Sequence, residues 1–238
     1  MSDNYPTMHC QSEIIADTGY TGFLPDETLF RWFHDRYSTS KHLLTLYSIA
    51  RGMNAKAIVE VGFGRSSFAL AKAAHLNGGR FYTCDNRDFS YLLSEEEKEV
   101  TTYVHANSNK LWPQLTENGI DFAFLDYFSS ESWGKDFVFN EFYNCFNLLK
   151  ENGMICLHDT LVGKYALSEF VEELKTRRFG LLHNSDLEVI SLPYNYGLGI
   201  VRRLKESPYG KVEDTFEKKD DGGEGTRGSQ GTAGGAGK

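Results

Sequence analysis

Glycines and acidic residues follow short apolar runs of the sequence, where the ends of parallel strands could share one ligand. The first run leads into EVGFGRSS at residues 60–67, and Asp85 and Asp126 close two later runs. Gly62 and Gly64 let the backbone turn tightly and approach a ligand closely, because neither carries a Cβ atom. A helix that starts directly after such a loop offers free N–H groups to an anionic group. The pattern therefore indicates a ligand-binding loop between a strand and a helix.

Asp85 stands 23 residues after Gly62 and is suited to bind a ribose. Its carboxylate can accept hydrogen bonds from both ribose hydroxyls of an adenosine, and NAD enzymes carry an acid at the same place. A dinucleotide-binding loop favours a third glycine, however, where this chain has Ser67. Two interpretations stay open at this point: a nucleoside-binding loop, or a plain strand-to-helix turn with a solvated aspartate nearby.

The elements that must position these residues alternate between strands and helices. Short β-branched or aromatic runs predict strands at residues 57–62, 80–85, 101–106, 120–126, 153–159, 187–192 and 197–203. Helical spacing predicts helices at 28–54, with a break and a serine or threonine cap near 38–40, and at 66–76, 94–100, 109–115, 137–150 and 161–179. This alternation predicts a doubly wound, Rossmann-like α/β fold with a mostly parallel sheet. The last two strands are joined too closely for a crossover, so we expect an antiparallel pair.

Composition favours one folded domain in a reducing compartment. We expect an N-terminal extension with helices at 1–54, a domain at 55–204 and a flexible glycine-rich tail at 205–238. The four cysteines lack C-x-x-C spacing, which argues against a zinc knuckle or a disulfide framework. The net charge of −8 repels polyanions, so nucleic acid is not an expected partner. No signal peptide or apolar run of about 18 residues is evident, which predicts a cytoplasmic protein that does not associate with membranes.

Six segments occur in a fixed order between about Ala57 and Arg203: EVGFGRSS, YTCD, HANS, AFLD, LKENGMICLHD and LPYNYGLGIV. In this order and spacing they resemble the small O-methyltransferases, a group of class I S-adenosylmethionine-dependent methyltransferases. That group includes the catechol and caffeoyl-CoA enzymes and the macrocin-type and cephalosporin-hydroxylase-type proteins. The resemblance implies an enzyme that transfers a methyl group from S-adenosylmethionine to a small molecule, with a hydroxyl oxygen as the expected acceptor atom.

The resemblance also assigns cofactor-binding roles where residues match. Glu60, Gly62 and Gly64, with Ser66 or Ser67 nearby, would line the methionine end, and Asp85 would hold the ribose. Asn107 and Ser108 would face the adenine, although a plain polar loop is the alternative. Asp126 would lie beside the sulfonium. An aspartate directly after a buried strand needs a partner to offset its desolvation, which favours a functional role for Asp126.

The chain departs from the family pattern at the residues expected to bind a metal and to transfer a proton. Asp126, Asp159 and His158 are candidate ligands for Mg²⁺ or another divalent cation, and Asp126 and His158 are the candidate catalytic residues. Catechol-type enzymes carry Asp-Asn, and macrocin-type enzymes Glu-Asp, where this chain has His158-Asp159-Thr160. Asp159 could instead cap the following helix.

The position of the family's general base holds Ser129, a poor base at neutral pH. His158 and Lys135 are the alternative bases, or the acceptor needs none.

Two rival functions remain open from the sequence. One is an NAD(P)-dependent oxidoreductase, and the other is a catalytically silent cofactor-binding or scaffold protein, which Ser129 would suit. The aromatic-rich stretches at 29–37, 127–139 and 194–196 could form a pocket for a small-molecule acceptor, or serve ordinary packing. Related enzymes commonly pair through their N-terminal helices, so a homodimer is compatible with the sequence.

Overall fold

A computed structural model of the protein describes residues 22–23, 26–34, 39–115, 119–127, 135–162, 166–176 and 187–204. All of these residues belong to the first of two units, residues 1–208. The glycine-rich tail predicted at 205–238 lies outside the described residues. None of the helices within these ranges is long and apolar enough to cross a membrane.

Within the described ranges, seven strands form one sheet in the order β3-β2-β1-β4-β5-β7-β6. The strands are β1 (Ala57–Val61), β2 (Arg80–Asp85), β3 (Thr101–His105), β4 (Ile120–Leu125), β5 (Leu149–His158), β6 (Leu187–Leu192) and β7 (Leu198–Arg203). The first five pair in parallel, whereas β7 runs antiparallel to both β5 and β6. The predicted mostly parallel sheet with a C-terminal antiparallel pair is confirmed. The strand order reverses between β1 and β4, which is where doubly wound sheets bind ligands.

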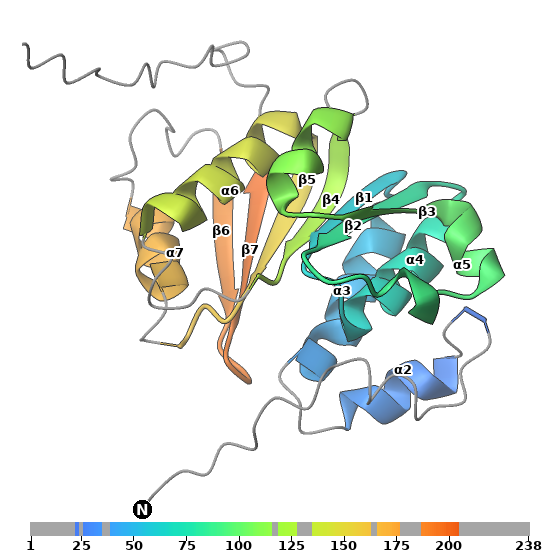
Figure 1. The fold of residues 1–238 in the computed structure, drawn as a ribbon. Coiled ribbons are helices and arrows are strands. Elements are labelled where there is room, and N and C mark those ends of the chain that lie inside the picture. The colour runs from blue at the N-terminus through green and yellow to red at the C-terminus, as the bar shows by residue number, and fades with distance from the viewer. Residues whose placement is uncertain are drawn as a thin grey trace, which may run out of the picture. The chain divides into compact units, whose positions relative to one another are not determined.

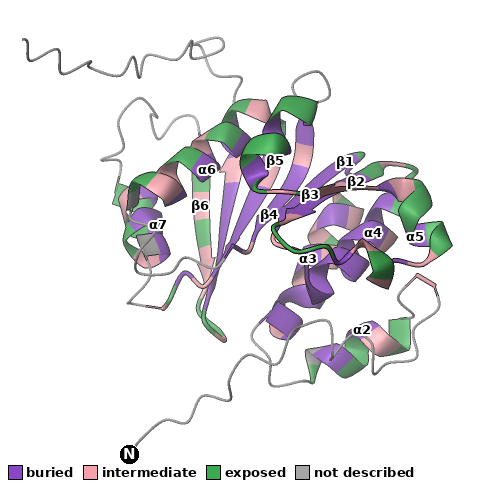
Figure 2. Cartoon of the chain, in the orientation of Figure 1, coloured by how far each residue is buried: buried purple, intermediate pink, exposed green. Residues whose placement is uncertain are grey.

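Helices cover both faces of the sheet (Figure 1). The α-helices are α2 (Asp26–Phe33), α3 (Leu43–Gly52), α4 (Arg65–Asn77), α5 (Glu95–Val100), α6 (Lys135–Leu148) and α7 (Ala166–Thr176). Side chains of α6 and α7 pack on one face of the sheet, and those of α3 and α4 pack on the other. The central strands are therefore buried along most of their length, which explains why they read as continuous apolar runs (Figure 2).

Short 3-10 helices occur where the sequence predicted a break near 38–40 and a helix at 109–115. The break predicted near 38–40 is present as η1 (Thr39–His42), but the expected serine or threonine cap of α3 is wrong. His42 precedes α3 and makes no side-chain capping bond, because the 3-10 turn already leads the chain into the helix. The helix predicted at 109–115 is instead two turns, η3 (Ser108–Lys110) and η4 (Trp112–Leu115). A further 3-10 turn, η2, spans Ser90–Leu92.

The charged helix predicted at 94–100 forms α5, and its start is well defined. Ser94 accepts a hydrogen bond from the Glu97 N–H at 3.2 Å, while the Glu97 carboxylate accepts one from the Ser94 N–H at 2.9 Å. This reciprocal capping box satisfies two N–H groups that the first turn would leave unpaired. The helix thereby returns the chain to the sheet at β3, next to β2.

Candidate cofactor and active site

The loop after β1 contacts the end of β4 through its backbone. Gly62 has a φ of +97°, which few other residues adopt, and its N–H donates to the Cys84 carbonyl at 3.0 Å. A Cβ atom on Gly62 would lie 2.2 Å from the Asp126 carbonyl oxygen. The Asp126 N–H in turn donates to the Val61 carbonyl at 3.0 Å. Glycine is therefore required here by both conformation and space.

Glu60 is fully buried at the end of β1, below the first turn of α4. The Ser67 hydroxyl donates to Glu60 Oε2, and the Thr83 hydroxyl lies 3.2 Å from the same oxygen. Burial raises the pKa of Glu60 to about 8, and hydrogen bonds from nearby hydroxyls, Ser66 among them, only partly offset this effect. Glu60 Oε1 has no well-formed hydrogen bond to any described residue. At neutral pH the Glu60 carboxyl group is therefore largely protonated, and its Oε1 retains hydrogen-bonding capacity.

The predicted glycine-loop residues around Glu60 have structural partners of their own. Gly64 precedes α4, and its N–H donates to the Ser67 hydroxyl at 2.9 Å. Ser66 and Ser67 are both fully buried in the first turn of α4. Ser67 thus links the loop backbone to the Glu60 carboxyl group, a role that the sequence alone did not suggest.

Asp85, at the end of β2, is held beside the glycine loop. Its Oδ2 accepts the Phe63 N–H at 3.1 Å, and its Oδ1 accepts the Arg87 N–H at 2.9 Å. The side chain is only partly buried. Two backbone donors therefore fix the carboxylate at the position expected to hold a ribose, next to the loop expected to hold the methionine end.

The predicted adenine-binding residues differ in their surroundings. Asn107 is exposed and makes no side-chain capping bond at the start of η3. Ser108 is buried and hydrogen bonds to Glu141, a buried residue of α6. Trp112 Nε1 also donates to Glu141, at 3.2 Å from Oε2. Sequence reasoning missed Glu141; the only signal was one acid amid the aromatic residues of FVFNEFYNCF.

Asp126 follows β4 and meets side chains from two distant segments. Its Oδ2 accepts a hydrogen bond from the Thr39 hydroxyl of η1 at 3.1 Å, and its Oδ1 lies 3.0 Å from His158 Nδ1 at the end of β5. Burial opposes ionisation, but the attraction of His158 and these hydrogen bonds outweigh it and lower the pKa of Asp126. The residue is therefore an anion at neutral pH. Its contact with Thr39 was not predicted.

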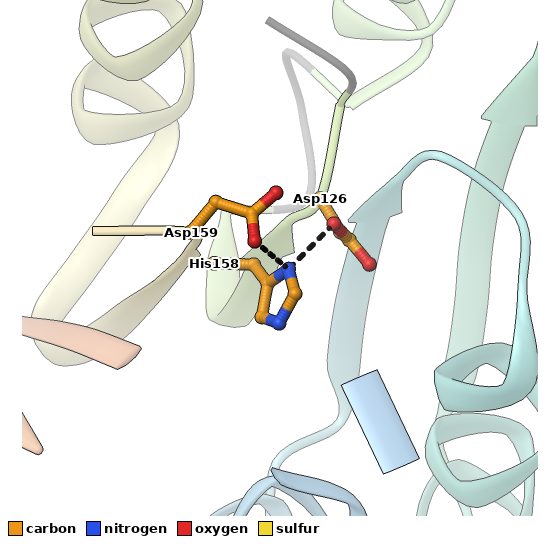
Figure 3. A group of neighbouring side chains, drawn as sticks. All are labelled: Asp126, His158 and Asp159. Atoms are coloured by element: carbon orange, nitrogen blue, oxygen red, sulfur yellow. Dashed lines mark hydrogen bonds and ion pairs between the residues drawn. The ribbon is translucent and has the colours of Figure 1, made fainter. Parts of the chain in front are cut away.

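His158 lies between two carboxylates (Figure 3). Besides its contact with Asp126, His158 Nδ1 lies 3.2 Å from Asp159 Oδ1. Although burial lowers the pKa of the imidazole, the two aspartates together raise it to about 10. At neutral pH the ring is an imidazolium held by two anions, and it has no proton-accepting capacity at Nδ1. Its Nε2 is buried and has no hydrogen-bond partner among the described residues.

Asp159 is directed toward His158 by an unusual backbone conformation. Its φ is +59°, a left-handed value that costs a non-glycine residue about 1–3 kcal/mol. The side chain thus turns toward His158 rather than toward α7, which begins only at Ala166. The geometry supports a role at the site more than the alternative of a helix cap.

Asp126, His158 and Asp159 have the donor set of a divalent cation site. One ligand atom from each residue lies within 4.8 Å of the others. Two carboxylate oxygens and an imidazole nitrogen suit Mn²⁺, Fe²⁺, Co²⁺ or Zn²⁺ better than Mg²⁺, which strongly prefers oxygen ligands. A metal would have to replace the proton on Nδ1, because a coordinating histidine is neutral. The residues present therefore fit a cation, in competition with a proton.

A buried histidine from the N-terminal segment packs against the ring of His158. His42, in η1, is fully buried, and its ring lies 5.1 Å from the His158 ring and 4.8 Å from the Tyr194 ring. Burial and the charge of His158 lower the pKa of His42 to about 4, so this ring is neutral. The Tyr194 hydroxyl lies 2.9 Å from the Thr45 hydroxyl. The turn between β6 and β7 thus contacts the start of α3 beside the site.

Some predicted residues lie where no side-chain structure is described. Ser129 falls in the gap between 127 and 135, and the side chain of Lys135 is not described. Of the aromatic stretch at 194–196, Tyr194 packs against the His42 ring, and both Tyr194 and Tyr196 are exposed.

Comparisons with known proteins agree with this architecture. Residues 59–160 match a family model described as a methyltransferase domain. A comparison with curated proteins gives no match. Among solved structures, methyltransferase PaMTH1 of Podospora anserina, bound to S-adenosylhomocysteine, is 16% identical, with 86% of this chain and 100% of that chain covered and a TM-score of 0.54.

Two further solved structures share the fold at a similarly low sequence identity. The O-methyltransferase of Bacillus cereus in complex with S-adenosylhomocysteine is 14% identical, with 82% of this chain and 96% of that chain covered and a TM-score of 0.53. The MycE methyltransferase of the mycinamycin biosynthetic pathway, with Mg and S-adenosylhomocysteine, is 14% identical, with 78% and 56% covered and a TM-score of 0.54. Residues 59–160 thus match a methyltransferase domain, and these solved methyltransferases share the fold, in agreement with the prediction from the sequence.

Proposed function

We propose that the chain transfers the methyl group of S-adenosylmethionine to a hydroxyl oxygen of a small molecule, with a divalent cation at the Asp126–His158–Asp159 group. One observation carries the proposal: the glycine loop, Asp85 and Asp126 converge at the switch point of the sheet. Phe63 of the loop binds the Asp85 carboxylate, and Gly62 lies against the Asp126 backbone. A single ligand at this edge would meet all three.

The acidic side chains along this edge could pair with the ammonium, ribose and sulfonium groups of the cofactor. Glu60 Oε1, buried and without a well-formed hydrogen bond, suits the ammonium group of the methionine portion. The Asp85 carboxylate, held by two backbone N–H groups, suits the ribose hydroxyls. Asp126 provides the negative charge near which a sulfonium would be stabilised. Structural neighbours bound to S-adenosylhomocysteine support this assignment.

The protein's own contribution to methyl transfer is positioning, because the reaction is an in-line displacement at carbon. Asp126 and Asp159 hold His158 in place, and Thr39 fixes the second oxygen of Asp126. His42 and Tyr194 bring apolar ring surface to the same place and would exclude water from the acceptor. When bound, a divalent cation would lower the pKa of an acceptor hydroxyl and so compensate for a serine at the general-base position. A neighbour that contains Mg supports this part of the proposal.

Binding of S-adenosylhomocysteine, measured by calorimetry, tests the cofactor assignment. We expect the wild-type chain to bind it, and Asp85→Ala to weaken binding by about 1.5–3 kcal/mol, the contribution of a hydrogen bond to a charged group. Asp88→Ala, an exposed acid on the same turn, is the matched control and should bind like the wild type. Unchanged affinity in Asp85→Ala would show that the ribose lies elsewhere.

Turnover separates the proposed enzyme from its rivals. The chain is incubated with labelled S-adenosylmethionine and a panel of hydroxylated and amine-bearing small molecules, with Mn²⁺, with Mg²⁺ or with a chelator, and products are read by mass spectrometry. We expect O-methylated product with metal and a strong decrease with chelator. Cofactor binding without any product would support the silent protein, and binding of NADH in place of S-adenosylhomocysteine would support the oxidoreductase.

A further inference from the structure

His42 is a fully buried imidazole whose hydrogen-bonding capacity the proposed chemistry does not use. Its ring packs between the rings of His158 and Tyr194. Neither of its ring nitrogens has a well-formed hydrogen bond to a described residue. Burial of a polar group without a partner costs free energy, and a phenylalanine would give similar ring packing without that cost. The histidine at this position therefore calls for an explanation beyond packing.

The second ring nitrogen of His158 also lacks a partner. Nδ1 faces both aspartates, whereas Nε2 lies on the opposite edge of the ring (Figure 3). Nε2 is buried, and no described residue forms a hydrogen bond with it. A histidine that binds a metal through one nitrogen generally donates the other N–H to an acceptor, which fixes the orientation of its ring. A cation at Nδ1 therefore requires an acceptor on the far side of His158.

His42 can supply that acceptor. The two ring centres lie 5.1 Å apart, close to the separation of two imidazoles joined by an N–H···N hydrogen bond of about 3 Å. A neutral imidazole has one N–H and one bare nitrogen, and the nearby backbone carbonyl of Asn195 can accept only the N–H. Phe124, which also packs against His158, offers no acceptor atom. The bare nitrogen of His42 is thus left for His158 Nε2.

We propose that His42 is a positioning residue for the metal site: when a divalent cation replaces the proton on His158 Nδ1, His42 accepts a hydrogen bond from His158 Nε2. The displaced proton passes to solvent, and the hydrogen bond holds the His158 ring in its coordinating orientation. This inference rests on the proposed function, because it assumes a cation at the Asp126–His158–Asp159 group. It goes further by giving a role to a residue of η1 that is not itself a ligand. Since the hydrogen bond is not formed in the structure, it would favour only the metal-bound state.

Calorimetric titration of the full chain with Mn²⁺ tests this role without any need for turnover. His42→Phe keeps a ring between His158 and Tyr194 but removes the acceptor, so we expect it to weaken Mn²⁺ binding by about 10-fold or more. His42→Gln should bind Mn²⁺ within about 3-fold of the wild type, because its amide oxygen can accept from His158. His105→Gln changes an exposed histidine at the end of β3 and should bind Mn²⁺ like the wild type.

A magnetic resonance measurement on the wild type tests the idea even if the variants fail to fold. The protein carries ¹⁵N-labelled histidine and is loaded with Zn²⁺, a diamagnetic probe for the same site. We expect a proton on His158 Nε2 and a nitrogen–nitrogen coupling across the hydrogen bond to His42. A histidine that serves only as packing would give no such coupling, so its absence from the Zn²⁺-loaded protein would overturn the inference.

The titrations also separate failure of this inference from failure of the proposed function. Equal Mn²⁺ affinity in the wild type and His42→Phe would overturn the role of His42 and leave the proposed function intact. Equal weakening in His42→Phe and His42→Gln would do the same, because it would show that the shape of the ring matters rather than its acceptor. Failure of the wild type to bind either Mn²⁺ or Zn²⁺ would instead refute the metal site of the proposed function, and this inference with it.

Discussion

Replacement of Gly62 by alanine is the sharpest single test of how the cofactor loop is built. The new Cβ would lie 2.2 Å from the Asp126 carbonyl oxygen, so one of the two segments must move by about 0.8 Å to reach the 3.0 Å below which such contacts essentially never occur. Overpacking of this kind costs about 1–3 kcal/mol. The φ of +97° adds about 1–3 kcal/mol for a residue with a side chain.

The expected loss of stability is therefore about 2–5 kcal/mol, after the smaller entropic gain of alanine over glycine in the unfolded chain is subtracted. For a domain of this size, about 2–4 °C of melting temperature is lost per kcal/mol, so we expect a decrease of roughly 5–20 °C. The movement would also displace Asp126 from the loop, and binding of S-adenosylhomocysteine should weaken by at least about 10-fold.

Differential scanning calorimetry and ligand titration measure the two effects separately. Gly52→Ala is the matched control, because nothing lies within 4 Å of a Cβ at that position, at the end of α3. The control should melt at the wild-type temperature or slightly above it. If Gly62→Ala melted like the control and bound ligand normally, the close approach of the loop to the end of β4 would be refuted.

Two predictions concern pH. Since the pKa of Glu60 is raised to about 8, the free protein holds a proton on this carboxyl group at pH 7, and a bound ammonium group should expel it. The affinity for S-adenosylhomocysteine, measured by calorimetric titration, should therefore rise between pH 6 and 8. Glu60→Gln should remove that rise. Affinity independent of pH in the wild type would contradict this. His158 has a folded pKa of about 10 against 6.5 in the unfolded chain, so its stabilisation is complete below pH 6.5 and is lost as pH rises through 10. With chelator present, the melting temperatures of the wild type and Asp126→Asn should therefore converge as the pH rises toward 10. A constant difference between them would argue against the ion pair of Asp126 and His158. Asp88→Asn, which changes an exposed aspartate, is the control.

The strand-end residues were predictable because one geometric rule governs them. The carboxyl ends of parallel strands lie at the same edge of a sheet, so Gly62, Asp85 and Asp126 were expected there, and the pairing of β1 with both β2 and β4 brings them together. The structure brings them together as the sequence indicated. Their roles toward the cofactor stay predictions until binding is measured.

The residues that sequence reasoning missed lie on helices and turns, where tertiary packing decides the contacts. Thr39 contacts Asp126, and Glu141 contacts Trp112, because η1 and α6 pack against distant segments, and no spacing in their own segments encodes that packing. The α-helix predicted at 109–115 does not form, and the reason is local. Pro113 lacks an N–H group and interrupts the α-helical ladder, so the segment forms 3-10 turns instead.

The contacts of η1 bear on where the N-terminal boundary of the domain is drawn. A boundary drawn at residue 55 from the alternation of elements would separate the sheet from Thr39 and His42, which touch Asp126 and His158 directly. It would also expose the face of α4 that α3 covers. A chain shortened to start at the first strand would then lack two side chains that contact residues of the proposed metal site. Exchange of N-terminal segments between related proteins would thus alter contacts at the proposed site as well as at the periphery.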